Sequence, residues 1–161
     1  MSEPSADPHV LEPGHAPTPF TADEIRDATV AGKEMWRHVD EDEEEPYLRV
    51  SRYLDCDPEG ATMERAMHAL DGTMIGETES ARVGWLDLQR HASFPADDTT
   101  IDDDIVTTAL GEHECLRYTV VVGEAIYVFW FAKDLPGMPV RQEVRQGGKV
   151  VATVTAVDGP A

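Results

Sequence analysis

The sequence predicts a mainly β domain, an antiparallel sheet of about nine strands that curls into a half-barrel around one short helix. Apolar and polar residues alternate through a series of short segments, as they do in strands. Asp71-Gly72, Gly123-Glu124 and Gly147-Gly148 are tight-turn sequences, so strands that are neighbours in sequence are expected to pair as a meander. A single sheet of this size must curl, and a helix can then fill its concave side.

The N-terminal part predicts a leader followed by a short helix. Residues 1–19 contain five prolines and few apolar residues, which predicts a disordered leader. Thr21 and Glu24 form a capping box, and Phe20 and Ile25 a hydrophobic staple, so a helix is expected over about 22–28. Residues 20–161 then form a single β-rich domain, which is the number of domains expected for a chain of 161 residues.

The remaining elements follow from periodicity. Strands are expected over 34–39, 47–56, 62–70, 73–83, 99–108, 114–122, 125–132, 139–146 and 149–157. Asp71-Gly72 is expected to form a two-residue type I′ turn. Residues 125–132 are apolar at both odd and even positions, which indicates a core strand covered on both faces. Residues 84–92 place Trp85, Leu88 and Ala92 at helical spacing, so the helix is expected here, between the fourth and fifth strands.

The charge limits the classes of partner. The chain has 32 acidic and 13 basic residues, a formal net charge of −19. Binding to nucleic acid or to an anionic membrane depends on basic residues that neutralise phosphates, so neither partner is expected. The acidity, including the run of six carboxylates over 40–45, permits a basic protein partner or a bound cation. A GC-rich genome with some salt adaptation is the simpler explanation of the acidity.

The sequence also bears on location. The first residues lack the basic and apolar regions of a secretory signal, so a cytoplasmic location is expected. No run of eighteen apolar residues occurs, so membrane insertion is not expected. Cys56 and Cys115 are then expected to be reduced core side chains. Because both fall in expected strands, an oxidised pair remains an alternative.

Three C-terminal segments resemble a known family. An aromatic strand at residues 129–131, the sequence Leu-Pro-Gly-Met-Pro-Val-Arg at 135–141 and the Gly-Gly-Lys-Val turn at 147–150 are similar in pattern to the lipoprotein-carrier superfamily of LolA- and LolB-like half-barrels. They also resemble bacterial families of unknown function that share the curved sheet. The resemblance covers about a quarter of the chain. It implies a concave apolar surface that holds an acyl chain, and a cavity-facing arginine for which Arg52 is the candidate.

The expected ligand site lies on the concave face. Aromatic residues near the inserted helix and along the strands, together with the candidate arginine, are the residues expected to line it: Trp36, Arg52, Trp85, Tyr118 and Trp130.

Two sequence patterns resemble parts of metal sites. Asp55, Asp57, Glu59 and Gly60 match the first half of a calcium loop, but the twelfth position, which needs glutamate, is Ala66. His113 and Cys115 share a face of a strand and would supply two ligands of a zinc site, with no further ligands identifiable. A polar turn and a buried thiol explain these patterns, so no metal is expected.

Sequence motifs of catalysis and of cofactor binding are missing. The chain contains no GxSxG, GxGxxG, phosphate-binding loop or CxxC sequence. No cofactor is expected, and the sequence favours a binding protein over an enzyme. Two hypotheses follow: a non-enzymatic protein that holds an apolar or acyl molecule on the concave face, and an acidic interaction module that engages a basic partner.

Overall fold

A computed structural model describes residues 7–159. Nine strands and three helical segments follow one another along this part of the chain. They are α1 (Ala22–Ala28), β1 (Glu34–Glu41), β2 (Tyr47–Leu54), β3 (Gly60–His68), β4 (Met74–Gly84), α2 (Trp85–Arg90), the 3-10 helix η1 (Ala96–Asp98), β5 (Thr99–Thr108), β6 (Gly111–Val122), β7 (Ala125–Ala132), β8 (Arg141–Gln146) and β9 (Lys149–Val157). The mainly β fold is confirmed; η1 was not expected.

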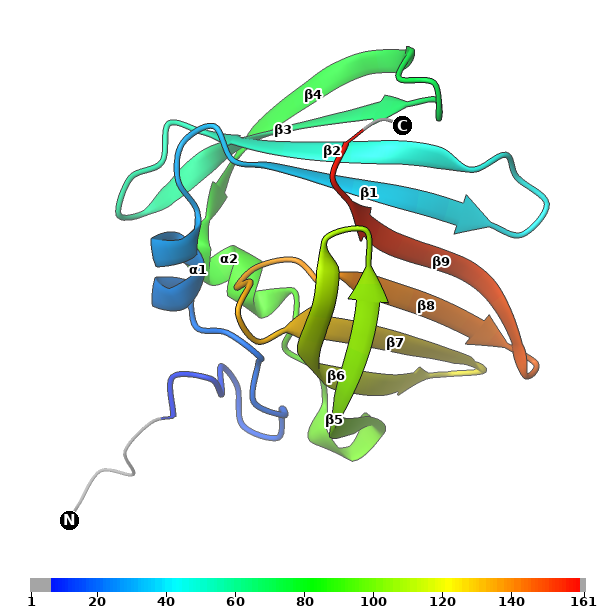
Figure 1. Ribbon diagram of the computed structural model, residues 1–161. Coiled ribbons are helices and arrows are strands. Elements are labelled where there is room, and N and C mark those ends of the chain that lie inside the picture. Colours follow the sequence, from blue (N-terminus) through cyan, green and yellow to red (C-terminus); the bar gives the residue numbers. More distant parts are fainter. Residues whose placement is uncertain (1–6, 160–161) are drawn as a thin grey trace.

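All nine strands form one antiparallel sheet, in the order β4-β3-β2-β1-β9-β8-β7-β6-β5. The sheet curls but does not close, because β4 and β5 remain as separate edges (Figure 1). The expected meander is confirmed within β1–β4 and within β5–β9. Of the expected neighbour pairings only that of β4 with β5 is absent, and the two meanders are joined instead through the first and last strands, with Trp36 opposite Val157.

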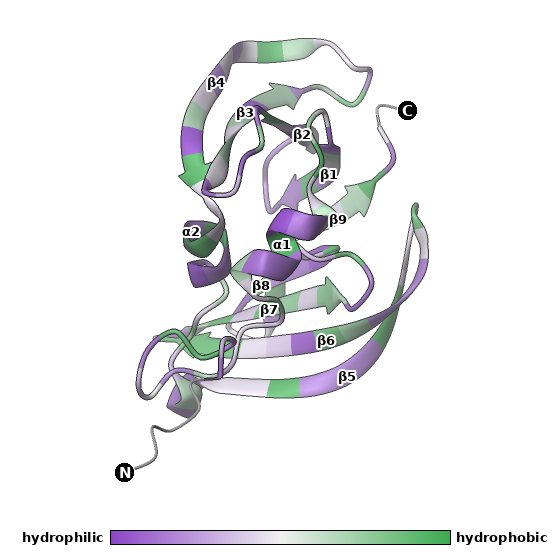
Figure 2. Cartoon of the chain, turned by 90° about the vertical axis from the view of Figure 1, so that its left-hand side faces the viewer, coloured by the Kyte–Doolittle hydropathy of each residue, from purple (hydrophilic) through white to green (hydrophobic). Residues whose placement is uncertain are grey.

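The two helices lie in the hollow between the two halves of the sheet (Figure 2). In α1 the Thr21 hydroxyl accepts a hydrogen bond from the Glu24 amide, and the Glu24 carboxylate accepts one from the Thr21 amide, so the capping box is present. Phe20 and Ile25 are both buried in the cluster on this side of the sheet, together with Trp85 of α2. Both helices therefore attach to the sheet through a few apolar side chains.

The expected core strand, β7, is covered on both faces. It lies third from the β5 edge, while β9 occupies the middle of the sheet. Phe129 and Phe131 pack in or against the cluster that holds the helices, and Val128, Trp130 and Ala132 belong to a second cluster. Successive side chains of a strand point to opposite faces, so an apolar run with no alternation serves two cores.

The β3–β4 turn differs from the expected type I′ hairpin. Such a turn needs a positive φ at both central residues, and here Gly72 has φ +93° whereas Asp71 has no positive φ. The Asp71 carboxylate accepts a hydrogen bond from the Thr73 amide, and the Ala69 amide donates to the Thr73 carbonyl. The hydrogen bond between the Asp71 carboxylate and the Thr73 amide thus accompanies a loop over 69–73 that is longer than the expected two residues.

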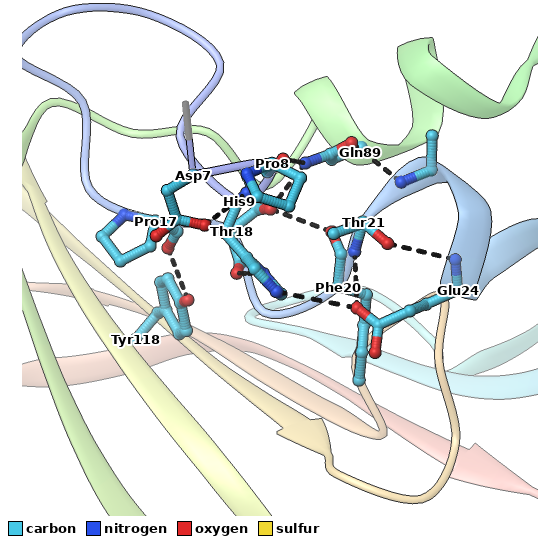
Figure 3. Close-up of polar contacts among 11 residues, drawn as sticks. Asp7, Pro8, His9, Pro17, Thr18, Phe20, Thr21, Glu24, Gln89 and Tyr118 are labelled. Carbon is cyan, nitrogen blue, oxygen red and sulfur yellow. Dashed lines mark hydrogen bonds and ion pairs between the residues drawn. The ribbon is translucent and has the colours of Figure 1, made fainter. Parts of the chain in front are cut away.

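Residues 7–19 of the leader, expected to be disordered, pack against the fold (Figure 3). Ala16 and Thr18 are buried, and the Ala16 amide donates to the Phe94 carbonyl at 2.8 Å. The Tyr118 hydroxyl donates to the Pro17 carbonyl at 2.6 Å. A proline-rich composition without apolar periodicity gives no sign of such partners, because they come from distant parts of the chain. Residues 1–6 of the expected leader lie outside the described residues.

No helix among residues 7–159 has the length and apolar character that a membrane crossing requires.

Candidate functional site

The concave side of the sheet contains a cavity of about 880 Å³. Strands β1 to β4, β7, the helix α2 and residues 137–139 all contribute to its walls. Sites for small molecules commonly have volumes of roughly 300–1,000 Å³ and combine apolar walls with a few polar groups. The cavity agrees with this description in volume and, as described below, in lining.

One side of the cavity is apolar and aromatic. Its main residues are Tyr53, Met63, Phe94, Phe129, Phe131 and Met138. Phe94 stacks on Phe129 with ring centroids 5.3 Å apart, and Phe129 stacks on Phe131 at 6.1 Å. These stacked rings present a firm apolar wall, because rings held by their neighbours have little freedom to rearrange.

The other side carries charged and polar groups. Arg37 of β1, Arg49 and Ser51 of β2 and Arg65 of β3 line it, together with Glu77 and Glu79 of the edge strand β4. In the sheet register Arg37 lies opposite Arg49, and Ser51 lies opposite Arg65. Opposed residues of paired strands point to the same face, so the arginines and the serine form one cationic patch.

Burial and like charge act together on Arg37. Its side chain is largely buried, and this burial, with the adjacent charge of Arg49, lowers the pKa of Arg37 to about 10. The guanidinium is still charged at neutral pH. Burial likewise raises the pKa of the Tyr53 phenol to about 12, so Tyr53 stays neutral beside it. The cavity therefore keeps its positive charge under ordinary conditions.

Two polar atoms of this patch lack a hydrogen-bond partner within residues 7–159: Arg37 Nε and Ser51 Oγ. Arg37 is 9% exposed and Ser51 0%. A buried polar group left without a partner costs about 1–3 kcal/mol, so nearly all such groups in folded proteins are paired. Both atoms belong to cavity-lining side chains but are themselves buried, so a molecule in the cavity becomes their partner once a side chain shifts to meet it.

None of the five residues expected to line the site borders this cavity. Trp36 and Arg52 lie on the other face of their strands, since they alternate with the cavity residues Arg37 and Ser51. The Trp36 indole donates to Glu34 at 3.0 Å, and Arg52 forms ion pairs with Glu34 and Glu64.

The other three expected residues are occupied by contacts of their own. The Trp85 indole donates to the Asp57 carbonyl at 2.7 Å, and Trp85 borders a smaller hollow of about 220 Å³. Tyr118 is 1% exposed and bonds to the leader. Trp130, on the other face of β7, donates to the Asp104 carboxylate at 2.8 Å. The aromatic character of these residues indicated burial, not access to a ligand.

The sequence does not point to the arginines and the serine of the cavity, because the apolar residues of β2 mark the opposite face of that strand. Leu48, Val50 and Leu54 do share a face, but β2 is also buried on its other face at Ser51 and Tyr53. A signal was available in the spacing. Arg49, Ser51 and Tyr53 alternate in the same strand, and a basic residue in that row hints at a polar wall.

The two patterns that resemble parts of metal sites have local roles. The Asp57 carboxylate accepts hydrogen bonds from the Glu59 and Gly60 amides and pairs with Arg82, so it holds the β2–β3 turn. His113 Nε2 lies 3.0 Å from the Thr108 hydroxyl, across the β5–β6 hairpin. Cys115 is fully buried, and both cysteines are free thiols.

Comparison with known proteins gave no match in any of three searches, against protein-family models, curated proteins and solved structures. The resemblance to lipoprotein carriers therefore stays a prediction.

Proposed function

We propose that this protein is a non-enzymatic binding protein that holds an apolar or acyl small molecule in the cavity on the concave face of its sheet. The observation that carries the proposal is the cavity of about 880 Å³ with a wall of stacked phenylalanines. Moving apolar surface from water onto such a wall is favourable by about 25 cal/mol per Å². The open edge between β4 and β5 supports the proposal as well, because the sheet is not sealed around the cavity.

Native mass spectrometry combined with titration tests the proposal. Freshly purified full-length protein is expected to carry a bound species or, once stripped, to take up dodecanoate saturably. Ala81→Trp, on the edge strand β4, introduces an indole into the cavity wall and should abolish uptake. Ser80→Trp is the matched control, since Ser80 is an exposed neighbour on the other face of β4. Protein that stays free of ligand throughout and shows no saturable uptake contradicts the proposal.

A second candidate function is an acidic interaction module that engages a basic protein. All six carboxylates of residues 40–45 are exposed, and within the described part of the chain only Asp42 has an ion-pair partner, Lys149 at 3.0 Å. Five of the six are thus available to a cationic surface. Screening shortens the reach of such charges from about 10 Å in 0.1 M salt to about 3 Å in 1 M salt. Binding to a polylysine probe that does not change between these salt concentrations contradicts this candidate.

A further inference from the structure

We infer that the cavity recognises the carboxylate head group of an amphipathic monoanion, with Arg37 and Ser51 as the head-group site and Arg49 and Arg65 beside them. The inference rests on the proposed function and goes beyond it by assigning the chemical class of the ligand. The ligand is a molecule of fatty-acid type: one carboxylate on an apolar chain.

The first support is the pair of unsatisfied buried atoms. Arg37 Nε and Ser51 Oγ have no hydrogen-bond partner among residues 7–159, although both side chains are at least nine-tenths buried. Ser51 lies opposite Met35 and Arg37 opposite Arg49 in the β1–β2 register, so Arg37 and Ser51 are diagonal neighbours on one face. A guanidinium N–H and a hydroxyl are both donors, and a carboxylate offers the acceptors that they lack.

The second support is the distribution of ion pairs. Within residues 7–159 three arginines have no carboxylate within 4.0 Å, and all three line the cavity: Arg37, Arg49 and Arg65. The seven other arginines of the chain each pair with a carboxylate: Arg26, Arg52, Arg82, Arg90, Arg117, Arg141 and Arg145. Acidic residues outnumber basic ones by 32 to 13, so partners for these three are not scarce. The arginines without a carboxylate partner are thus confined to the cavity lining, where Arg49 donates a hydrogen bond to the Tyr47 hydroxyl at 3.0 Å and Arg65 is exposed to solvent.

The third support is the charge balance of the lining. The lining contains three arginines and two glutamates, Glu77 and Glu79, so these five side chains together carry one positive charge. A monoanion neutralises that charge, whereas a dianion such as a phosphate monoester leaves an excess of negative charge beside the two glutamates. Arginine also suits a carboxylate geometrically, because its planar N–H groups can form two parallel hydrogen bonds to it.

The apolar chain of the ligand has a place on the same concave face. Strands β9 and β8 separate Arg37 from β7, and adjacent strands lie about 4.8 Å apart, so Arg37 lies about 14 Å along the sheet from Phe129 and Phe131. Phe129 and Phe131 of β7 receive the chain at the end of that path. Between them, Gln142 of β8 lies opposite Phe129 and also lines the cavity, so the cavity reaches β8 beside the aromatic residues.

Calorimetric titration of the full-length protein tests the inference with three probes of equal chain length: dodecanoate, dodecanol and dodecyl phosphate. Dodecanoate is expected to bind the wild type at least tenfold more tightly than either of the other two. This comparison needs no variant. Charge-assisted hydrogen bonds are the stronger kind, so Arg37→Met should weaken dodecanoate binding by about tenfold to a hundredfold and change dodecanol binding by much less. Ser51→Ala should act in the same direction with a smaller effect.

Arg52→Met is the matched control, because Arg52 lies on the same strand as Ser51 but on the other face and pairs with Glu34 and Glu64. It should leave binding of all three probes unchanged. Equal affinity for dodecanoate and dodecanol overturns the head-group inference while the proposed function stands. Tighter binding of dodecyl phosphate overturns the assignment of a monoanion. If none of the three probes binds, both the inference and the proposed function fall.

Discussion

Gln89 of α2 joins three parts of the structure through one buried side-chain amide. Its Oε1 accepts a hydrogen bond from the Ala22 amide at 2.8 Å, at the start of α1. Its Nε2 donates to the Pro8 carbonyl at 2.7 Å and to the Thr18 hydroxyl at 3.0 Å, both in the leader (Figure 3). With Gln89 only 3% exposed, water cannot easily replace these bonds. Gln89→Leu keeps the approximate volume and removes all three.

The expected loss of stability follows from these contacts. Each hydrogen bond contributes about 1 kcal/mol net, and a buried group left unpaired costs about 1–3 kcal/mol. The apolar leucine offsets part of this, so the free energy of unfolding should fall by about 3 kcal/mol. This is a large share of the roughly 5–15 kcal/mol that stabilises a typical domain. With a denaturant slope of about 2 kcal/mol per M, the urea midpoint should fall by about 1.5 M.

Urea unfolding followed by tryptophan fluorescence measures this effect, and hydrogen–deuterium exchange at the Ala16 and Thr18 amides reports on the leader. In the variant both amides should exchange faster, since their partners, the Phe94 and His9 carbonyls, are held by the same docking. Gln146→Leu, at an exposed end of β8, is the control and should stay within about 0.5 kcal/mol of wild type. If Gln89→Leu also stays within that limit and its leader is equally protected, the linking role of Gln89 is refuted.

Three further predictions concern packing, pH and thiol chemistry. A Cβ at Gly60 would lie 2.0 Å from the Val83 carbonyl oxygen, so Gly60→Ala should lower the free energy of unfolding by more than about 2 kcal/mol. Gly84→Ala, whose nearest neighbour is the movable Asp87 carboxylate at 3.2 Å, should cost about 1 kcal/mol or less, and equal losses in thermal unfolding would contradict the steric reason. The hydrogen bond from the Trp130 indole holds the pKa of Asp104 below its ordinary value. Ionised Asp104 therefore stabilises the fold fully at pH values above its unfolded-state pKa of about 3.9. This contribution is lost as the pH falls through the lower pKa of the folded state. Asp104→Asn should therefore flatten the loss of melting temperature below about pH 4, and an unchanged acid limb would argue against that role. In the native protein, Ellman's reagent should leave the buried Cys115 unmodified and should modify Cys56 slowly, because burial raises the pKa of both thiols. In the denatured protein the reagent should titrate two thiols. Fewer than two would indicate an oxidised pair.

Local patterns determined most of the secondary structure. Thr21 and Glu24 are three residues apart, so they specify the start of α1 without reference to the rest of the chain. The two glycines at 147–148 both take positive φ, as the turn between β8 and β9 requires. The unbroken apolar run of β7 indicated a strand between two cores, since alternation disappears when both faces are buried.

Only the tertiary structure decided the pairing of β1 with β9, the docking of the leader and the composition of the cavity. Each depends on contacts between residues far apart in the chain, such as that of Tyr118 with Pro17, and the local sequence does not specify such contacts. The cavity shows the limit most clearly. Tryptophan and arginine are residue types common at ligand sites, so Trp130 and Arg52 are stronger candidates from the sequence than Ser51. Which side chains meet across a curled sheet, however, depends on the face to which each residue points and on the register of the strands. For this reason the sequence does not predict that three strands bring together the polar residues of the cavity, Arg37, Arg49, Ser51 and Arg65.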